Sequence, residues 1–353
     1  MSDSTSWTIR PYRPGDETAL VALFARVFNR PISEDHWRWK LKRSTNIPNV
    51  FLAVVPDAAA GDRPVFQCAA IPVRYRGPDG DVLGMVSVDT MTDPDFRRQG
   101  VMTTVNRHAY ECWREAGAAF VIGLPNEQWG SRARALGWHE LFPLTWRVRL
   151  LRPDRIVARR LGRPLALAAK ALSRPWNAYW RRRIRDDPAV RIRRVGAADV
   201  FDRLWPILEQ SRGSSTTYSI VRDRAWIDWR YLSAPDASYR IWVAETVESP
   251  IGYCVSRLVN RDGRNVGLVA ELAAAGDEDG VLHRLLGHAV SDLDREGAEL
   301  VAALAMPGTP ADGALRRAGF LFGWGSFTVQ TVPLRSATPF PFSEVHGGDF
   351  DVV

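Results

Sequence analysis

Two hydrophobic periods alternate along the first 140 residues. Short runs rich in Val, Ile, Phe and Met predict three strands, at 50–55, 65–76 and 81–92, with "GPDG" as the turn between the last two. Apolar residues then recur about every four positions over Val101–Ala116, which predicts an amphipathic helix that ends at Gly117. The apolar strand "AAFVIG" and a second helix follow. Hairpins followed by strand, helix, strand and helix predict an α/β fold with a mixed sheet.

The same order of elements occurs twice. The halves open "WTIRPYRPGDETALVALFARVF" and "VRIRRVGAADVFDRLWPILEQS", each a short strand, a turn and a helix. Each half continues with a helix that carries Trp-Arg-Trp or Trp-Arg-Tyr, and both halves close on similar segments. Three matching landmarks in one order predict a tandem duplication. We expect domains at 7–150 and 191–335, with a linker at 151–190 and a tail at 336–353.

Composition narrows the class of protein. A chain of 353 residues that is 46% hydrophobic can fold into two globular domains. The three cysteines show no CxxC spacing, which argues against a disulfide framework or a zinc site and favours a reduced, cytoplasmic protein. The N-terminal residues show no signal-peptide pattern. Glycines interrupt the uncharged segment Ala318–Leu334, so we expect two short strands there and no membrane span.

The net charge of +7 is concentrated in the linker. Between Arg152 and Arg194, 14 basic residues stand against three aspartates, and the rest of the chain is mildly acidic. The pattern predicts a helix that begins at Pro164 and ends before Pro175. One face of this helix is expected to carry the residues Leu165, Ala168, Leu172 and Trp176. A solvated connector is the favoured interpretation, peripheral contact with a membrane is second, and nucleic-acid binding is the least favoured.

The stretch "DPDFRRQGVMTT" places dense positive charge between a strand and a helix. A helix that starts near Gly100 leaves its first amides without intrahelical acceptors, which favours an anion. Gly100 has no Cβ, and Arg97 and Arg98 add charge-assisted hydrogen bonds. The spacing fits neither a Walker loop nor a dinucleotide-binding turn. By spacing alone, a phosphate site and an ordinary basic turn stay equally open.

The string TxPxxRxxGxM, from Thr92 to Met102, resembles the acetyl-CoA signature VxPxx[RQ]xxGx[GA] of the GNAT acetyltransferase superfamily. Its place before the long helix is also similar, as is "PN" with Asn126 after the next strand. The resemblance covers 7–150 by motifs and 191–335 by the repeat alone. It implies an α+β mixed-sheet GNAT fold in two tandem copies, joined by the basic helical linker, with a degenerate second copy.

The resemblance also implies acetyl-CoA as co-substrate, with no metal. The backbone amides of Arg98 to Thr103 would hold the pyrophosphate, while Thr90 to Thr92 and Asn126 would contact the pantetheine arm. The residues expected to bind acetyl-CoA are Thr90, Met91, Thr92, Arg97, Arg98, Gln99, Gly100, Val101, Met102, Thr103 and Asn126. Met102 stands where the signature has Gly or Ala, which crowds the site slightly.

Asp89 is the candidate general base, because a carboxylate in a Val/Ser/Thr/Met strand is costly unless it is used or paired. The alternative is that Asp89 pairs with an arginine or orders a loop. His36 and His108 are interpreted as residues of helix faces. Many GNAT enzymes carry a tyrosine as general acid where this chain has Ala133, so the group that protonates CoA is left open.

The second half lacks the Arg-x-x-Gly motif, and its acidic "GDEDG" disfavours a pyrophosphate. Glu271 aligns with Asp89 in the repeat and is a candidate substrate contact. Trp37, Trp39 and Trp129 are further candidate substrate contacts, because aromatic faces suit sugar rings, although core packing is the favoured interpretation of the tryptophans in the Trp-Arg motifs.

We therefore expect an N-acetyltransferase that moves an acetyl group from acetyl-CoA directly to a primary amine of a small molecule, with an amino sugar or a related biosynthetic intermediate weakly favoured. A protein lysine is an alternative acceptor. A catalytically degenerate GNAT protein that acts as a membrane-associated scaffold is the alternative from another class. The acceptor, the acyl-chain preference and the oligomeric state stay open.

Overall fold

The computed structural model describes residues 6–42, 47–57, 61–125, 129–161, 163–183, 187–213, 216–276 and 279–350. Contacts divide the chain into two compact units, each built from separate stretches of sequence. Unit 1 comprises residues 1–142, 217–220 and 328–342, and unit 2 comprises 143–216, 221–327 and 343–353.

Unit 1 contains a mixed sheet. Its strands, in sheet order, are β1 (Thr8–Pro11), β2 (Val50–Asp57), β3 (Gly61–Gly77), β4 (Gly80–Thr92), β5 (Ala118–Gly123) and the end of β13 (Phe322–Pro333), with the short β8 (Ser219–Ile220) on β3. Neighbouring strands are antiparallel except β4 and β5, which are parallel. The sequence thus predicted the strands and the mixed sheet of this half.

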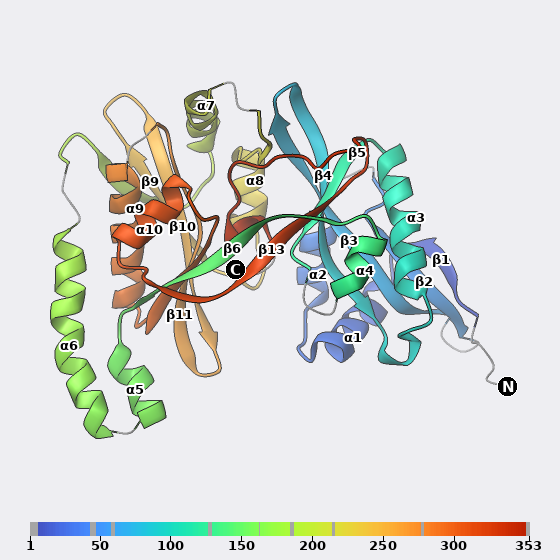
Figure 1. Cartoon of the computed structure of the whole chain (residues 1–353), viewed down its shortest axis with the longest axis horizontal. Coiled ribbons are helices and arrows are strands. Elements are labelled where there is room, and N and C mark those ends of the chain that lie inside the picture. The colour runs from blue at the N-terminus through green and yellow to red at the C-terminus, as the bar shows by residue number, and fades with distance from the viewer. Residues whose placement is uncertain are drawn as a thin grey trace. The chain divides into compact units, whose positions relative to one another are not determined.

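The helices of unit 1 are α1 (Glu17–Phe28), α2 (Glu34–Leu41), the 3₁₀ turn η1 (Pro94–Phe96), α3 (Val101–Glu115) and α4 (Gly130–Ala135). The apolar stripe of α3 is buried through Val105, Ala109 and Trp113, as its period predicted, and it joins the core formed with β2, β3 and β5 (Figure 1). This packing fixes the start of α3 relative to the end of β4.

Unit 2 repeats the same strand order. Its strands are β7 (Arg191–Val195), β9 (Tyr239–Glu245), β10 (Pro250–Arg261), β11 (Arg264–Ala274), β12 (Leu300–Ala305) and the end of β6 (His139–Leu150). Only β11 and β12 run parallel in this series. Its helical elements are α7 (Phe201–Ser211), α8 (Arg224–Ile227), the π-helical turn η2 (Asp228–Leu232), α9 (Asp279–Arg295), α10 (Pro310–Arg317) and η3 (Gly347–Asp349). Two copies of one topology are therefore present.

The closing strands are exchanged between the two halves of the sequence. The end of β6, Thr145–Leu150, pairs with β12 of unit 2, and the end of β13, Gln330–Pro333, pairs with β5 of unit 1. The units accordingly differ from the expected domains 7–150 and 191–335, which keep each closing strand in its own half. Strands pair through backbone groups that are the same in every sequence. The hydrophobic pattern of a strand therefore does not identify the strand with which it pairs.

The basic linker forms two helices of unit 2 that lie side by side, α5 (Pro153–Leu161) and α6 (Arg163–Arg182) (Figure 1). The predicted end before Pro175 is wrong, because α6 continues through this proline. Proline in a helix costs one hydrogen bond and about 3 kcal/mol. The turn beyond it is anchored on unit 2: Asn177 Nδ2 donates to the Leu151 carbonyl over 2.8 Å, and Trp180 packs on Gly319.

Two further expectations concern membranes and strands. None of the helices in the described ranges is both long and apolar enough to cross a bilayer. The segment Ala318–Leu334 forms one strand, β13, where the sequence predicted two.

Candidate functional site

The pairing between β4 and β5 ends where the site is expected. Their parallel pairing ends at Val86 and Ile122, while β4 continues on the β3 side to Thr92. The register between β3 and β4 shifts at Asp89 and Thr90, where two residues of β4 stand opposite one of β3. Asp89 has a φ of +45°, which is rare for a non-glycine residue. The bulge therefore changes the direction of the β4 backbone in the part of the strand that no longer pairs with β5.

Asp89 forms a nearly buried ion pair at this bulge. Its Oδ2 lies 2.8 Å from Nζ of Lys40 on α2, and the two side chains are only 8% and 2% exposed. Gln67 Nε2 donates to the Asp89 carbonyl over 3.0 Å, and Trp37 Nε1 donates to Gln67 Oε1 over 3.1 Å. The partner of Asp89 is thus a lysine on α2, a pairing that the sequence pattern did not predict.

Thr90 presents a buried hydroxyl without a partner. Its Oγ1 is inaccessible to water and makes no hydrogen bond with any described residue. Buried hydroxyls in proteins are nearly always hydrogen-bonded, so an orphaned one suggests a missing ligand group. A carbonyl or amide of a bound molecule would satisfy it.

The turn after β4 is fixed by Asp93, whose side chain is buried. Its carboxylate accepts from Arg26 at 2.6 Å, from Arg63 at 3.2 Å and from the amide of Asp95 at 3.1 Å. The sequence analysis missed this role of Asp93, although an aspartate before a proline is a common signal for the start of a turn. The clamp sets the direction in which the chain enters α3.

Most of the amides that follow are free. The backbone N–H groups of Arg98 and of Gly100 to Thr103 have no acceptor among the described residues, whereas that of Gln99 closes the turn at Arg97 and Arg98. Arg98 and Gly100 have φ values of +64° and +78°, a left-handed geometry that turns successive amides toward one point. No atom outside the neighbouring residues lies within 4 Å of where a Cβ of Gly100 would stand. The corner is therefore open and suited to an anion.

The side chains of Arg97 and Arg98 complete this corner. Both are exposed, and neither pairs with a carboxylate in the described part of the chain. Gln99 Nε2 instead donates to the Asp95 carbonyl over 2.9 Å and so braces the turn. Two unpaired guanidinium groups beside free amides favour a phosphate.

Comparison with known families decides the class of this site. Residues 8–140 match the profile of a family described as an acetyltransferase (GNAT) domain. We refer to residues 8–140, which are similar to this family, as the GNAT domain. The match includes the bulge of β4, the Asp93 turn and α3. A search of curated proteins finds no match.

Solved structures share the fold over nearly the whole chain. A GCN5-related N-acetyltransferase from Kribbella flavida is 14% identical, with a TM-score of 0.63, covering 93% of this chain and 72% of its own. One from Anabaena variabilis is 9% identical, with a TM-score of 0.63 and coverage of 94% and 73%. Saccharomyces cerevisiae N-myristoyltransferase with bound myristoyl-CoA is 9% identical, with a TM-score of 0.64 and coverage of 94% and 84%. The fold of two GNAT copies is thus shared with solved acyltransferases.

The remaining expected acetyl-CoA residues of the GNAT domain differ in exposure. Met91 and Val101 bury their side chains, so only their backbone can face a ligand. Met102 is half-buried and packs on the core, which leaves the corner open despite its size. Thr92 and Thr103 are half-buried, and Asn126 lies outside the described residues.

The three candidate tryptophans of the GNAT domain differ in burial. Trp37 is fully buried with its indole N–H bound to Gln67, so it cannot touch a substrate in this arrangement. Trp39 is half-buried, with its ring 5.1 Å from that of His36. Trp129 is half-buried against Trp138, at 5.7 Å. Ala133 is buried in the same core and supplies no proton.

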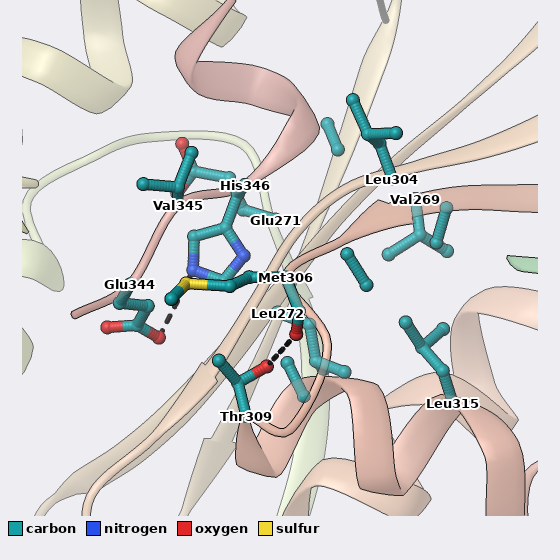
Figure 2. Close-up of a pocket in the computed structure, with 14 residues that line it drawn as sticks. Val269, Glu271, Leu272, Leu304, Met306, Thr309, Leu315, Glu344, Val345 and His346 are labelled. Carbon is teal, nitrogen blue, oxygen red and sulfur yellow. Dashed lines mark hydrogen bonds and ion pairs between the residues drawn. The ribbon is translucent and has the colours of Figure 1, made fainter. Parts of the chain in front are cut away.

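Unit 2 has a split like that of the GNAT domain, but the chain's own tail enters it. The pairing of β11 and β12 ends at Val269 and Ala303, and both strands continue. A small pocket, partly open to solvent, lies there, with His346 and Glu344 on one wall (Figure 2). His346 forms an antiparallel bridge with Ala305 of β12. Protein backbone thus lies where the first copy has an open strand edge.

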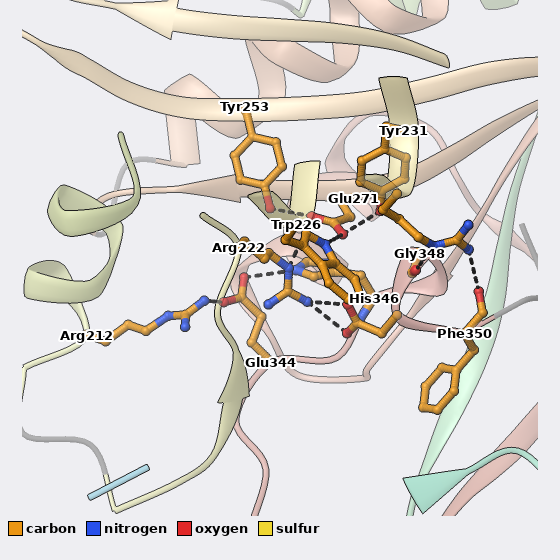
Figure 3. A network of polar contacts seen from close by, with 12 residues as sticks. Arg212, Arg222, Trp226, Tyr231, Tyr253, Glu271, Glu344, His346, Gly348 and Phe350 are labelled. Carbon is orange, nitrogen blue, oxygen red and sulfur yellow. Dashed lines mark hydrogen bonds and ion pairs between the residues drawn. The ribbon is translucent and has the colours of Figure 1, made fainter. Parts of the chain in front are cut away.

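Glu271, the candidate substrate contact, is the centre of a buried network (Figure 3). It accepts hydrogen bonds from Arg222, Trp226, Tyr231 and Tyr253. Burial opposes ionisation of Glu271, but Arg222 and the tyrosine hydroxyls keep its pKa below the usual value. Its carboxylate is therefore saturated by protein groups.

The network also fastens the tail. Arg222 Nη2 donates to both oxygens of Asp349, at 2.6 and 2.8 Å, and Arg230 donates to the carbonyls of Gly348 and Phe350 (Figure 3). The role of Arg222 and Arg230 in holding the tail was not predicted, because their partners in the tail lie more than 100 residues away.

Proposed function

We propose that the GNAT domain transfers an acetyl group from acetyl-CoA to a primary amine of a small molecule. The observation that carries the proposal is the group of free amides between Arg98 and Thr103, open at Gly100, after a strand that extends beyond its pairing with β5. An amino sugar or a related biosynthetic intermediate is the acceptor that we favour.

Three groups of residues would hold the co-substrate. The amides of Arg98 to Thr103 would bind the pyrophosphate, with the guanidinium groups of Arg97 and Arg98 beside it. The free hydroxyl of Thr90 would donate to a carbonyl of the pantetheine arm or of the thioester. Acetyl-CoA supplies an activated thioester, so the protein needs to position it and to deliver a neutral amine.

The amine must lose its proton before it attacks. For a lysine-like amine with a pKa of about 10.4, this costs about 4.6 kcal/mol at pH 7, and for a group near pKa 8 only about 1.4 kcal/mol. We assign the proton to the carboxylate of Asp89, acting directly or through water, with Lys40 holding this carboxylate in place. Because the tyrosine position is Ala133, water is our candidate to protonate the departing CoA thiolate.

We further propose that the second copy does not bind CoA. It lacks the Arg-x-x-Gly motif, and the segment 344–346 lies in its strand split. In our proposal, this copy shapes the protein around the acceptor or stabilises the first copy.

Ligand-induced thermal stabilisation tests the binding step. Acetyl-CoA should raise the melting temperature of the full chain, whereas acetyl-pantetheine, which has no pyrophosphate, should do so far less. Replacing both Arg97 and Arg98 by Ala should weaken acetyl-CoA binding about 100-fold, since each charge-assisted contact is worth about tenfold. Arg13→Ala, which removes an exposed charge elsewhere in unit 1, serves as the control.

Thiol release from acetyl-CoA with a panel of amines then tests the transfer itself. Turnover with small amines and amino sugars is expected. Binding of acetyl-CoA without thiol release on any amine would sink the proposed activity, and equal stabilisation by acetyl-pantetheine would sink the proposed anion grip.

A further inference from the structure

Helix α6 exposes apolar side chains to solvent. Leu165, Leu167 and Tyr179 are 54%, 71% and 50% exposed, and they include the most exposed leucine among the described residues. Ala168 and Pro175 are exposed as well. Single exposed leucines are ordinary on protein surfaces, but several exposed apolar residues on one helix indicate an interaction surface.

The opposite face of α6 holds the helix on unit 2. Ser173 and Trp180 are buried, and Asn177 donates to the Leu151 carbonyl. At 100° per residue, Leu165, Ala168, Pro175 and Tyr179 form one stripe that faces away from these contacts, and Leu167 lies about 80° further round the helix than Pro175. The sequence had placed Trp176 on the face of Leu165 and Ala168, but this tryptophan is half-buried whereas they are exposed. The apolar stripe is therefore left uncovered.

Unpaired cations lie on the side of the helix that carries Leu167. Lys170 and Arg174 are exposed, and no carboxylate in the described ranges pairs with either. Arg183 lies over the rings of Tyr179 and Trp180, 5.5 and 5.7 Å from their centres. These charges differ from those of α5, where Arg159 pairs with Glu299 and so fastens the helix to unit 2.

We propose that α6 lies in the interface of an anionic lipid bilayer. Leu165, Leu167 and Tyr179 would enter the boundary between headgroups and acyl chains, while Lys170 and Arg174 would contact lipid phosphates. A nucleic acid would contact the cations but would leave the exposed leucines in water. A connector surrounded by water would need neither the exposed leucines nor the unpaired cations. The proposal is independent of the proposed acetyl transfer.

Vesicle sedimentation with the full chain tests this surface. The protein should bind vesicles of phosphatidylcholine with 30% phosphatidylserine, bind pure phosphatidylcholine vesicles weakly, and dissociate as salt rises. Changing Lys170 and Arg174 together to Gln should weaken binding about 25-fold, because each cation near the surface is worth roughly fivefold. Arg132→Gln with Arg134→Gln removes the same charge from exposed positions on α4 and should have little effect.

The leucines separate a membrane from other polyanions. Leu165→Gln with Leu167→Gln should weaken vesicle binding at least about tenfold at unchanged charge, whereas Val247→Gln, at a fully exposed position in unit 2, should not. Circular dichroism would establish that each variant keeps its fold. Absence of salt-sensitive binding to the anionic vesicles overturns the proposal. So does equal binding by the leucine variant, and binding of duplex DNA that ignores the leucines would assign the cations to nucleic acid instead.

Discussion

At the scale of single residues, the Asp89–Lys40 pair separates a catalytic from a structural role. Asp89→Asn should lower kcat/KM by about 10²–10⁴ because it removes the base. It should also destabilise the fold by roughly 3 kcal/mol, since the buried ammonium group of Lys40 loses the carboxylate of Asp89. Steady-state kinetics from pH 6 to 9 and urea unfolding measure the two effects.

The double variant Asp89→Asn with Lys40→Met is the matched control. It removes both charges, so we expect stability to recover while activity stays lost. If activity returned together with stability, Asp89 would be a structural residue. If the single Asp89→Asn enzyme kept full turnover across the pH range, the base would be another group.

A second residue, His346, should make stability depend on pH. Burial lowers its pKa to about 4, with Arg222 adding to the effect and Asp349 and Glu271 opposing it. Its ring accepts from the Asp349 amide and donates to Glu344. Because the pKa in the folded state lies below the usual 6.5, the unfolded chain binds the proton first as pH falls. The stability that neutral His346 contributes is complete above pH 6.5 and is lost toward pH 4.

Urea unfolding of wild type and His346→Gln between pH 7.5 and 4.5 measures this contribution. We expect wild type to lose up to about 3 kcal/mol more than the variant over this range. His139→Gln, at an exposed position, should follow wild type. Equal pH slopes for wild type and His346→Gln would contradict the assignment.

The sequence predicted the features that depend on residues close together in the chain. The open corner at Gly100 follows from a motif of eleven residues between Thr92 and Met102, because the turn is local. The ion pair of Arg26 with Asp93 joins residues 67 positions apart and left no pattern to detect. The same holds for Lys40 and Asp89, 49 positions apart.

At the scale of elements, periodicity placed the strands and helices but not their partners. The boundaries of α3 and β5 match the expected ones to within one residue, because local hydrophobic period and glycines determine them. The continuation of α6 through Pro175 depends on contacts of Asn177 and Trp180 with distant residues. The exchange of β6 and β13 depends on the sheet edge that each strand meets, which no local pattern encodes.

The tail is an element whose attachment can be measured. Asp349→Asn should destabilise unit 2 by about 3–5 kcal/mol. The buried guanidinium group of Arg222 would lose the carboxylate of Asp349 and keep that of Glu271. Asp199→Asn, an exposed position, should change stability by less than about 0.5 kcal/mol. Urea unfolding of both variants checks this, and equal stabilities would show that the tail is not held by this pair.

At the scale of the whole molecule, one topology occurs twice, but the place where the two central parallel strands stop pairing differs between the copies. In unit 1 the split between β4 and β5 keeps free amides and an orphaned Thr90 hydroxyl at its end. In unit 2 the split between β11 and β12 is entered by residues 344–346, and the buried carboxylate of Glu271 is saturated by side chains. The strand edge that is open in the first copy is therefore occupied in the second.

This asymmetry predicts the stoichiometry of co-substrate binding. A full chain with two competent copies would bind two molecules of acetyl-CoA, whereas we expect one, because only the first copy has an open row of amides beside Arg97 and Arg98. Isothermal titration should give one site, and Arg97→Ala with Arg98→Ala should weaken that site without revealing another. A second site that survives this change would mean that the tail yields to the ligand in unit 2. Removal of residues 343–353 would then strengthen that second site, since the tail and the ligand would compete for the same strand edge.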